Sequence, residues 1–181
     1  MPPASVAVFL ASRLGDDPAV IALTAEVGVA LARAGVTIVY GGASVGLMGT
    51  LADAALAAGG KVVGVLPRSM IDRELAHPGL TELHIVDGMA SRKAEMMARA
   101  EAFLVLPGGF GTLDEMFEVL TLRQIGEHQK PVAILDPVRF YDHLYAFFDH
   151  AAATGLLAPH LRGVAPRLAN LDELGTWLAM S

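Results

Sequence analysis

Short apolar runs alternate along the chain with longer segments that have helical spacing. The apolar runs are rich in Val, Ile and Leu and are soon followed by Gly, Pro or Ser. This alternation is typical of βαβ units, in which helices cover both faces of a parallel sheet. It predicts an α/β fold with a Rossmann-like, doubly wound parallel sheet of about six to seven strands.

The boundaries of the expected elements follow from the same pattern. Strands are expected at 5–10, 36–40, 61–66, 82–86, 102–106 and 131–135, with a weaker last strand at 164–168. Helices are expected at 18–34, 47–58, 91–100, 112–125, 141–154 and 171–180. Segment 69–78 has mixed charge and no clean period, which indicates a loop or a short irregular helix over the strand ends. Because no repeat or linker divides the chain, residues 1–181 are expected to form a single domain.

Charge and cysteine content exclude several classes of protein. The 181 residues include 13 basic and 19 acidic side chains and no cysteine, which gives a formal net charge of −6. An acidic chain is a poor general nucleic-acid binder, because such proteins need a basic face. A small anionic ligand is still allowed, since backbone amides bind phosphate without net positive charge. The lack of cysteine removes disulfides, thiolate zinc sites and cysteine nucleophiles.

The chain is hydrophobic but shows no segment expected to enter a membrane. Hydrophobic residues make up 54% of it, yet charged residues such as Glu26, Arg33, Asp53 and Lys61 interrupt the apolar stretches. Its first residues, Met-Pro-Pro-Ala, carry no basic segment followed by an apolar one, so no signal peptide is expected. A cytoplasmic location is therefore expected.

The first candidate binding loop is residues 40–49, with the sequence YGGASVGLMG, between an expected strand and an expected helix. In a doubly wound sheet the ligand crevice lies at the carboxyl ends of the strands, where such loops are found. Glycines allow a sharp turn and a close approach of backbone N–H groups to an anion. The loop lacks both the G-x-G-x-x-G pattern and the P-loop lysine, which disfavours an NAD or ATP-hydrolysing site. A glycine turn that only packs helix against sheet is the alternative.

The second candidate loop is residues 106–115, with the sequence LPGGFGTLDE. Free amides at the start of the following helix are suited to hold a phosphate, with Thr112 adding a hydroxyl group. The spacing of Thr112 and Glu115 also fits a capping box, in which Glu115 only accepts a hydrogen bond from the Thr112 amide. A carboxylate beside a phosphate loop is unfavourable unless it has a chemical task, which favours a functional role for Glu115.

A basic pair, Arg92 and Lys93, follows Ser91, a residue suited to cap the next helix. Cations in the first turn oppose the helix dipole, so an anionic partner is expected, either a ligand phosphate or Glu115. A surface pair screened by water is the alternative. Arg73 and Glu74, in isolation, indicate a solvated charge pair.

Metal and serine-hydrolase chemistry have no sequence signature here. The six histidines show no H-E-x-x-H or other zinc spacing, and the chain has no G-x-S-x-G motif. No metal site is expected.

Together these segments resemble the Lonely Guy (LOG) family, phosphoribohydrolases that release cytokinin bases from their riboside 5′-monophosphates. The P-G-G-x-G-T-x-x-E motif with an upstream R-K pair is far more specific than either glycine loop alone. The resemblance covers nearly the whole chain and is carried by VAVF at 6–9, Ser12, Gly15, the 40–49 loop, Arg92-Lys93, PGGFGTLDE at 107–115, Thr121, Gln124, Gly126, His128, KPV at 130–132 and FYD at 140–142.

The resemblance implies specific site residues. By residue match, Arg92 and Glu115 are catalytic. The implied substrate-binding residues are Ser12, Gly42, Glu74, Met89, Lys93, Gly108, Gly109, Phe110, Gly111, Thr112, Asp114 and Thr121. The chain departs from the family pattern at Ala11, Ala43, Ala90 and Leu122, where the family often has Gly, Gly, His and Trp. These departures leave the catalytic groups in place and bear on the shape of the base pocket.

The implied reaction is hydrolysis of the N-glycosidic bond of a nucleoside 5′-monophosphate, AMP or a cytokinin riboside monophosphate, without a cofactor. Its transition state resembles an oxocarbenium ion, so Glu115 is expected to stabilise positive charge and orient the attacking water. Amides of 108–112 are expected to anchor the 5′-phosphate. Arg92 is expected to keep Glu115 ionised and to help fix either the phosphate or the sugar hydroxyl groups, and Glu74 to contact the ribose or the leaving base.

Two other functions stay open at this point. Relatives with this motif are often labelled lysine decarboxylases, but that chemistry needs pyridoxal phosphate on a lysine, and neither Lys61, Lys93 nor Lys130 is placed like one. A nucleotide-binding module without catalysis is the other alternative, although a pure binder gains nothing from a carboxylate beside an anionic ligand. The resemblance also implies a homodimer, with helix 112–125 expected in the contact.

Overall fold

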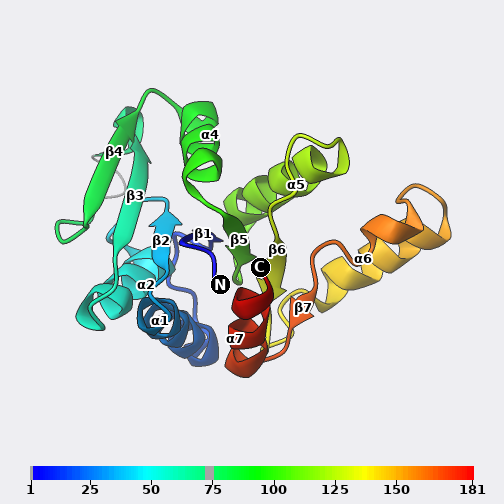
Figure 1. Ribbon diagram of the computed structural model, residues 1–181, viewed down its shortest axis with the longest axis horizontal. Helices are drawn as coiled ribbons and strands as arrows, with labels where there is room; N and C mark the ends of the chain where they lie inside the picture. Colours follow the sequence, from blue (N-terminus) through cyan, green and yellow to red (C-terminus); the bar gives the residue numbers. More distant parts are fainter. Residues whose placement is uncertain (1, 72–75) are drawn as a thin grey trace.

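A seven-stranded, all-parallel sheet forms the centre of the computed structural model, which describes residues 2–71 and 76–181 (Figure 1). Its strands are β1 (Ser5–Phe9), β2 (Thr37–Tyr40), β3 (Val62–Pro67), β4 (Glu82–Val86), β5 (Ala102–Val105), β6 (Val132–Leu135) and β7 (Arg167–Leu168). Their order across the sheet is β4-β3-β2-β1-β5-β6-β7. The predicted doubly wound fold is confirmed. The weak last strand is shorter than expected, because only Arg167 and Leu168 pair with β6.

The helices occupy the expected segments between the strands. They are α1 (Pro18–Arg33), α2 (Gly46–Ala57), α4 (Met89–Arg99), α5 (Phe110–Gln124), α6 (Asp142–Ala153) and α7 (Leu171–Met180). Two short 3-10 helices, η1 (Arg68–Met70) and η2 (Pro159–Leu161), lie in the connections. In its described residues, the 69–78 segment contains part of η1 and an antiparallel bridge from Ala76 to Ala43. Arg73 and Glu74, singled out from the sequence, lie outside the described residues.

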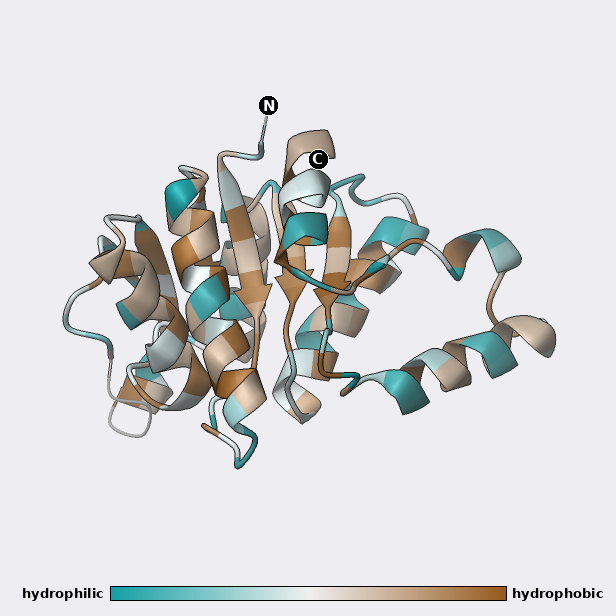
Figure 2. Ribbon diagram, turned by 90° about the horizontal axis from the view of Figure 1, so that it is seen from below, coloured by the Kyte–Doolittle hydropathy of each residue, from teal (hydrophilic) through white to brown (hydrophobic). Residues whose placement is uncertain are grey.

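Alternating side chains of the strands divide the core into two layers. In β1, Val6 and Val8 pack on the side of α1, α2 and α7, while Ala7 and Phe9 pack on the side of α4 and α5. Both layers are almost completely buried, as expected for a sheet covered on its two faces. In Figure 2 the strands are largely hydrophobic, and hydrophilic residues lie on the helices. Helix α6 projects beyond the β7 edge of the sheet (Figures 1 and 2).

The strand order places a crevice between β1 and β5. From β1 the chain builds the sheet outward through β2, β3 and β4, then returns to pair β5 with the other side of β1. The loops after β1 and β5 therefore lead to helices on opposite faces of the sheet and leave a gap between them, which is where ligands bind in such folds.

Among the helices of the described residues, none is long and apolar enough to cross a membrane.

Candidate active site

A cavity of about 360 Å³ opens at the carboxyl ends of β1 and β5, where the strand order reverses. Its walls come from the loops after these two strands, from η1, and from the first turns of α2, α4 and α5. The lining residues are Leu10, Ala11, Ser12, Arg13, Met48, Met70, Met89, Arg92, Gly109, Phe110, Gly111, Thr112 and Glu115. The structure thus brings together both residues expected to be catalytic and six of those expected to bind substrate.

The start of α5 forms one wall of the cavity. Gly109 is the N-cap and makes no side-chain capping hydrogen bond, so Phe110, Gly111 and Thr112 form the first turn. The Leu113 amide donates to the Gly109 carbonyl oxygen at 3.0 Å, whereas amides earlier in a helix have no acceptor within it. The first-turn amides are thus at the cavity, in the arrangement that favours an anion.

The capping-box alternative for Thr112 and Glu115 is wrong. Thr112 lies inside the helix, two residues after its first position, and therefore is not the N-cap. Its side chain is 2% exposed and packs against Gly108, where a Cβ atom would overlap the Thr112 hydroxyl group. Position 108 consequently needs glycine because the helix start approaches the loop so closely.

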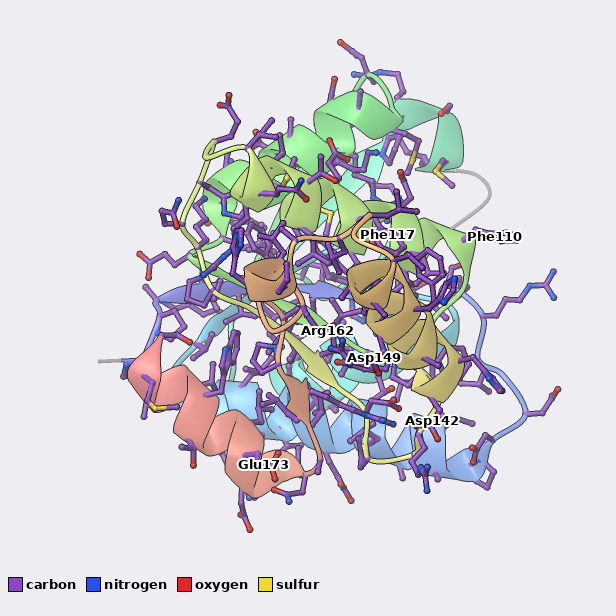
Figure 3. The ribbon with its side chains drawn as sticks, turned by 90° about the vertical axis from the view of Figure 1, so that its right-hand side faces the viewer. Phe110, Phe117, Asp142, Asp149, Arg162 and Glu173 are labelled. Atoms are coloured by element: carbon purple, nitrogen blue, oxygen red, sulfur yellow. The ribbon has the colours of Figure 1, made fainter. Side chains whose placement is uncertain are left out.

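Glu115 lies one turn further along α5 and is 7% exposed. Its carboxylate is part of the cavity wall that also contains Thr112 and Arg92. Phe110, at the start of the same helix (Figure 3), is 93% exposed at the cavity mouth. The cavity therefore combines a buried carboxylate with an apolar side chain that is available to cover a ligand.

Arg92 is 3% exposed and is held by the ends of two strands. Its Nε donates to the Val65 carbonyl oxygen at 3.1 Å, and its Nη2 donates to the Gly41 carbonyl oxygen at 3.0 Å. A Cβ atom at position 41 would overlap the guanidinium group. Arg92 is therefore not the surface cation of the alternative interpretation.

Lys93 points away from this cavity, although it is adjacent in sequence. Its Nζ lies 2.9 Å from Asp114 and 2.6 Å from Glu118 on α5. Hydrogen bonds to these two carboxylates, led by Glu118, raise the pKa of the Lys93 ammonium group. Arg92 therefore lies at the cavity, whereas Lys93 joins α4 to α5.

The start of α4 differs in detail from the expectation. The helix begins at Met89 with Gly88 as its N-cap, so Ser91 lies inside the helix and does not cap it. The two additional residues at the start bring Met89 to the cavity wall, with its sulfur 3.8 Å from Nη1 of Arg92.

Several predicted substrate-binding residues lie outside this cavity. Lys93, Asp114 and Thr121 line a neighbouring groove between α4 and α5. Gly108 lines an adjoining pocket together with Gly109. The remaining two are Gly42, which packs against Leu66 and Leu83 with a φ of +81°, and Glu74, which is outside the described residues.

The 40–49 loop contributes mainly through packing. Gly46 lies so close to the Ser12 backbone that a Cβ atom would overlap it, and Gly49 approaches the Ser44 backbone in the same way. Met48 from this loop reaches the cavity wall. These contacts fit the packing interpretation of the loop, and Gly41 adds the carbonyl oxygen that holds Arg92.

Some lining residues were not expected from the sequence. Leu10, Arg13 and Met70 belong to no motif, Met48 lies in the 40–49 loop without having been singled out, and all four reach the cavity because their segments converge at the same sheet edge. These residues could have been found from the sequence by their position after the expected strands, since the carboxyl ends of adjacent parallel strands meet at one edge of the sheet. Among the described residues, no group of three or more His, Asp or Glu side chains is arranged to hold a metal ion.

Comparison with known proteins identifies the family. The family described as "possible lysine decarboxylase" matches residues 48–176. A cytokinin riboside 5′-monophosphate phosphoribohydrolase of Rhodococcoides fascians is 48% identical over 161 residues, covering 88% of this chain and 81% of the relative. The phosphoribohydrolase LOG of Oryza sativa subsp. japonica is 40% identical over 169 residues, covering 93% of this chain and 70% of the relative. The chain belongs to the LOG family.

Structural similarity extends further than the LOG family. A molybdenum cofactor carrier protein from Chlamydomonas reinhardtii superimposes with a TM-score of 0.72 at 19% identity, covering 98% of both chains. At that identity the similarity supports the shared Rossmann-like fold alone.

The departures from the usual LOG sequence are spread through the structure. Ala11 lies in the cavity wall, and Leu122 lies in the neighbouring groove. Ala43 is fully buried beside the sheet, and Ala90 is exposed on the first turn of α4. Of these four positions, Ala11 is thus the one that lines this cavity.

Proposed function

We propose that this LOG-family chain hydrolyses the N-glycosidic bond of a nucleoside 5′-monophosphate, AMP or a cytokinin riboside monophosphate, to the free base and ribose 5-phosphate. The observation that carries the proposal is that one cavity combines buried Glu115 and Arg92 with the amide-lined start of α5. Relatives named for this reaction, at up to 48% identity, support it.

The α5 start anchors the phosphate. Amides of the first turn and the Thr112 hydroxyl group donate to its oxygens, and the partial positive charge of the helix end favours the dianion. Anchoring one end of the substrate places the ribose over Glu115, one turn further along the helix.

Glu115 acts at the sugar. As the bond from C1′ to the base nitrogen breaks, its electron pair leaves with the base, and the ribose becomes an oxocarbenium-like cation. The carboxylate stabilises this charge and accepts a proton from the water that attacks C1′. The base takes up a proton as it departs, so the net reaction consumes one water molecule.

Arg92 supports the site through its fixed position. Its guanidinium group is held by the Gly41 and Val65 carbonyl oxygens, so its charge is maintained beside the cavity without rearrangement. The positive charge stabilises negative charge in the cavity, that of the Glu115 carboxylate and that of the nucleotide phosphate. Lys93, Asp114 and Thr121, which lie in the neighbouring groove, stay predictions as substrate contacts.

The alternative of lysine decarboxylation does not fit the residues present. None of the three lysines lines the cavity, and the Nζ of Lys93 is engaged by two carboxylates. The Nζ of Lys130 donates to the Met97 carbonyl oxygen at 2.6 Å, and Lys61 is exposed before β3. A Schiff base with pyridoxal phosphate therefore has no suitable lysine at this site.

The family resemblance and an apolar groove also support a homodimer. The groove has a volume of about 300 Å³ and lies between α5, α6 and the segment after α6. It includes Phe117 on α5, Phe147 on α6 and Leu156, which are 39%, 58% and 88% exposed. The Arg162–Asp149 ion pair at 2.6 Å lies beside it (Figure 3). A second copy of the chain that covers this groove would bury these side chains, with α5 in the contact as expected.

The test of the proposed activity is direct. The protein is incubated separately with AMP and with isopentenyladenosine monophosphate, and the products are separated by chromatography. Free base and ribose 5-phosphate in equal amounts are expected from at least one substrate. Tight binding of intact nucleotide without product would instead support the non-catalytic binding module.

A further inference from the structure

The turn that leads into the phosphate-binding helix is tied to the start of α6 by a buried hydrogen bond. The Tyr141 hydroxyl group donates to the Leu106 carbonyl oxygen at 2.9 Å, and the two residues are 3% and 0% exposed. Leu106 immediately precedes Pro107 and the two glycines before α5. Because water has no access to this carbonyl, loss of the hydroxyl group would leave it without a replacement donor.

The same hydroxyl group also contacts the next part of the turn. Burial raises the pKa of the Tyr141 phenol well above its usual range, and a hydrogen bond from the Gly108 backbone acts in the opposite direction. The phenol therefore stays protonated at neutral pH. The protonated hydroxyl group donates to the carbonyl oxygen of Leu106, the residue immediately before Pro107.

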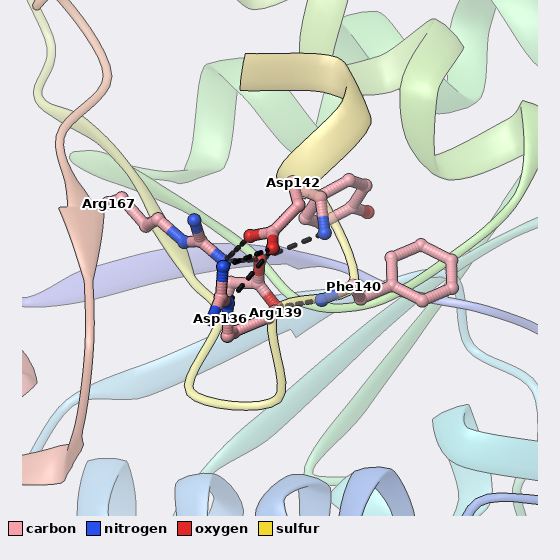
Figure 4. A network of polar contacts seen from close by, with 6 residues as sticks. Asp136, Arg139, Phe140, Asp142 and Arg167 are labelled. Carbon is pink, nitrogen blue, oxygen red and sulfur yellow. Dashed lines mark hydrogen bonds and ion pairs between the residues drawn. The ribbon is translucent and has the colours of Figure 1, made fainter. Parts of the chain in front are cut away.

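Tyr141 is itself held by the buried carboxylate of Asp136, which also contacts Phe140 and Arg167 (Figure 4). Asp136, 2% exposed at the end of β6, accepts from the Phe140 amide at 2.7 Å and from the Tyr141 amide at 2.9 Å. Arg167 of β7 lies 2.8 Å from the same carboxylate and neutralises its charge. A buried carboxylate with two amide donors and a cation has little freedom to move, which keeps the Tyr141 backbone in place.

Arg167 connects this cluster to the first turn of α6. Its Nη2 lies 2.7 Å from Asp142, which also pairs with Arg139 at 2.8 Å. The contacts thus run from β7 through Asp136 and Tyr141 to the turn after β5. The chain of contacts ends at the backbone from which the α5 amides project.

We propose that Tyr141 is a positioning residue that holds the backbone at Leu106, before the loop into α5, so that the first-turn amides of α5 meet the substrate phosphate. The inference rests on the proposed function, because it assigns the α5 start to phosphate binding. The hydroxyl group acts through the loop and does not line the cavity itself.

The test compares Tyr141→Phe with Tyr145→Phe. Tyr145 is a matched control, because its buried hydroxyl group has no hydrogen-bond partner among the described residues, and it lies on α6 below Arg162 and Arg167. Tyr141→Phe is expected to raise the KM for AMP about tenfold and to leave kcat within about twofold, since phosphate binding acts equally on substrate and transition state. Tyr145→Phe is expected to leave both constants unchanged.

Ribose 5-phosphate separates binding from turnover. Its dissociation constant, measured by calorimetry, is expected to rise about tenfold in Tyr141→Phe, while the affinity for free adenine stays the same. A purely structural role would lower the Tm and leave these constants at the wild-type values. Such a result, with both variants folded, would overturn the positioning role.

A second pair of variants is available if Tyr141→Phe does not fold. Asp136→Asn retains the Tyr141 hydroxyl group but weakens its support, whereas Asp142→Asn removes the other carboxylate paired with Arg167. Asp136→Asn is expected to raise the KM about threefold and Asp142→Asn to leave it unchanged. Equal KM values in the two variants would contradict the proposal.

The two hypotheses fail in distinguishable ways. Absence of base release by the wild-type protein would refute the proposed function. Normal base release together with an unchanged KM in Tyr141→Phe would refute the positioning role alone.

Discussion

The backbone of Gly41 lies directly against the Arg92 guanidinium group, although the two residues are 51 positions apart in the chain. The contact joins the end of β2 to the first part of α4 through a hydrogen bond of 3.0 Å. Glycine at this position is thus explained by the volume of a neighbouring side chain.

The first prediction concerns this contact. Gly41→Ala places a methyl group where the guanidinium lies, so Arg92 must move. We expect kcat/KM for the nucleotide to fall about 100-fold, because small displacements of catalytic groups are costly. Stability should fall by about 1–3 kcal/mol from overpacking. Gly163→Ala is the control, since a Cβ atom there meets nothing within 4 Å. Wild-type kinetics in Gly41→Ala would show that the position of Arg92 is unimportant.

The second prediction concerns Glu115. Glu115→Gln keeps the shape of the side chain but removes the charge that stabilises the ribosyl cation. AMP binding should stay within about threefold of the wild type, while base release falls at least about 1,000-fold. Calorimetry and chromatography measure the two effects, and Glu26→Gln, at an exposed position on α1, is the control. Turnover close to the wild-type rate would remove Glu115 from the mechanism.

The third prediction is a pH dependence of stability that originates at His128. Its Nε2 bonds to the Val119 carbonyl oxygen at 2.9 Å, and its Nδ1 accepts from the Lys130 amide at 3.1 Å, which requires the neutral ring. Burial lowers the pKa of His128 below 6.5, with further lowering by Lys130 and Arg123 against the effect of the Val119 bond.

The unfolded chain therefore binds a proton at His128 more readily than the folded protein does. The contribution of the neutral ring to stability is complete above pH 6.5 and is lost as the pH falls through the lowered folded-state pKa. Urea unfolding at about pH 7.5 and about pH 5.5 measures the loss. His128→Gln should lose less stability than the wild type over this interval, and an equal loss would contradict the assignment.

The fourth prediction tests the proposed homodimer. Phe147→Asp puts a charge into the apolar groove between α5 and α6 and should weaken association by about 2 kcal/mol or more. Light scattering should then report the monomer mass at a concentration where the wild type is dimeric. Met180→Asp on α7, also at an exposed apolar residue, should leave the mass unchanged. A monomeric wild-type protein would refute the dimer itself.

The fold was predictable because its signals are local. Apolar runs such as 102–106 and the helical spacing that follows them depend on neighbours in sequence, and β5 and α5 formed where expected. Element ends were less accurate. Helix α5 begins at Phe110 and not at Thr112, because the Gly109 backbone adopts the cap position without any side-chain signal.

The sequence motifs predicted which residues form the candidate site, but they did not predict which side chains face the cavity. Arg92 and Lys93 are adjacent in sequence, but successive residues on a helix point in directions about 100° apart. Which of them meets the cavity depends on the elements packed against α4. The expected capping role of Ser91 and the capping box at Thr112 are not formed, because Gly88 and Gly109 are the N-caps of the two helices.

The layered α/β fold, the two glycine loops and the family could be inferred from the amino-acid sequence, since periodicity and motifs are carried by residues close together in the chain. Tertiary structure alone decided that Gly41 holds Arg92, that Lys93 turns to Asp114 and Glu118, and that Tyr141 reaches the loop before α5. These contacts join residues that are between 21 and 51 positions apart in the chain. Such pairings follow from how strands order in the sheet and from the volume left between packed side chains, which no local pattern encodes.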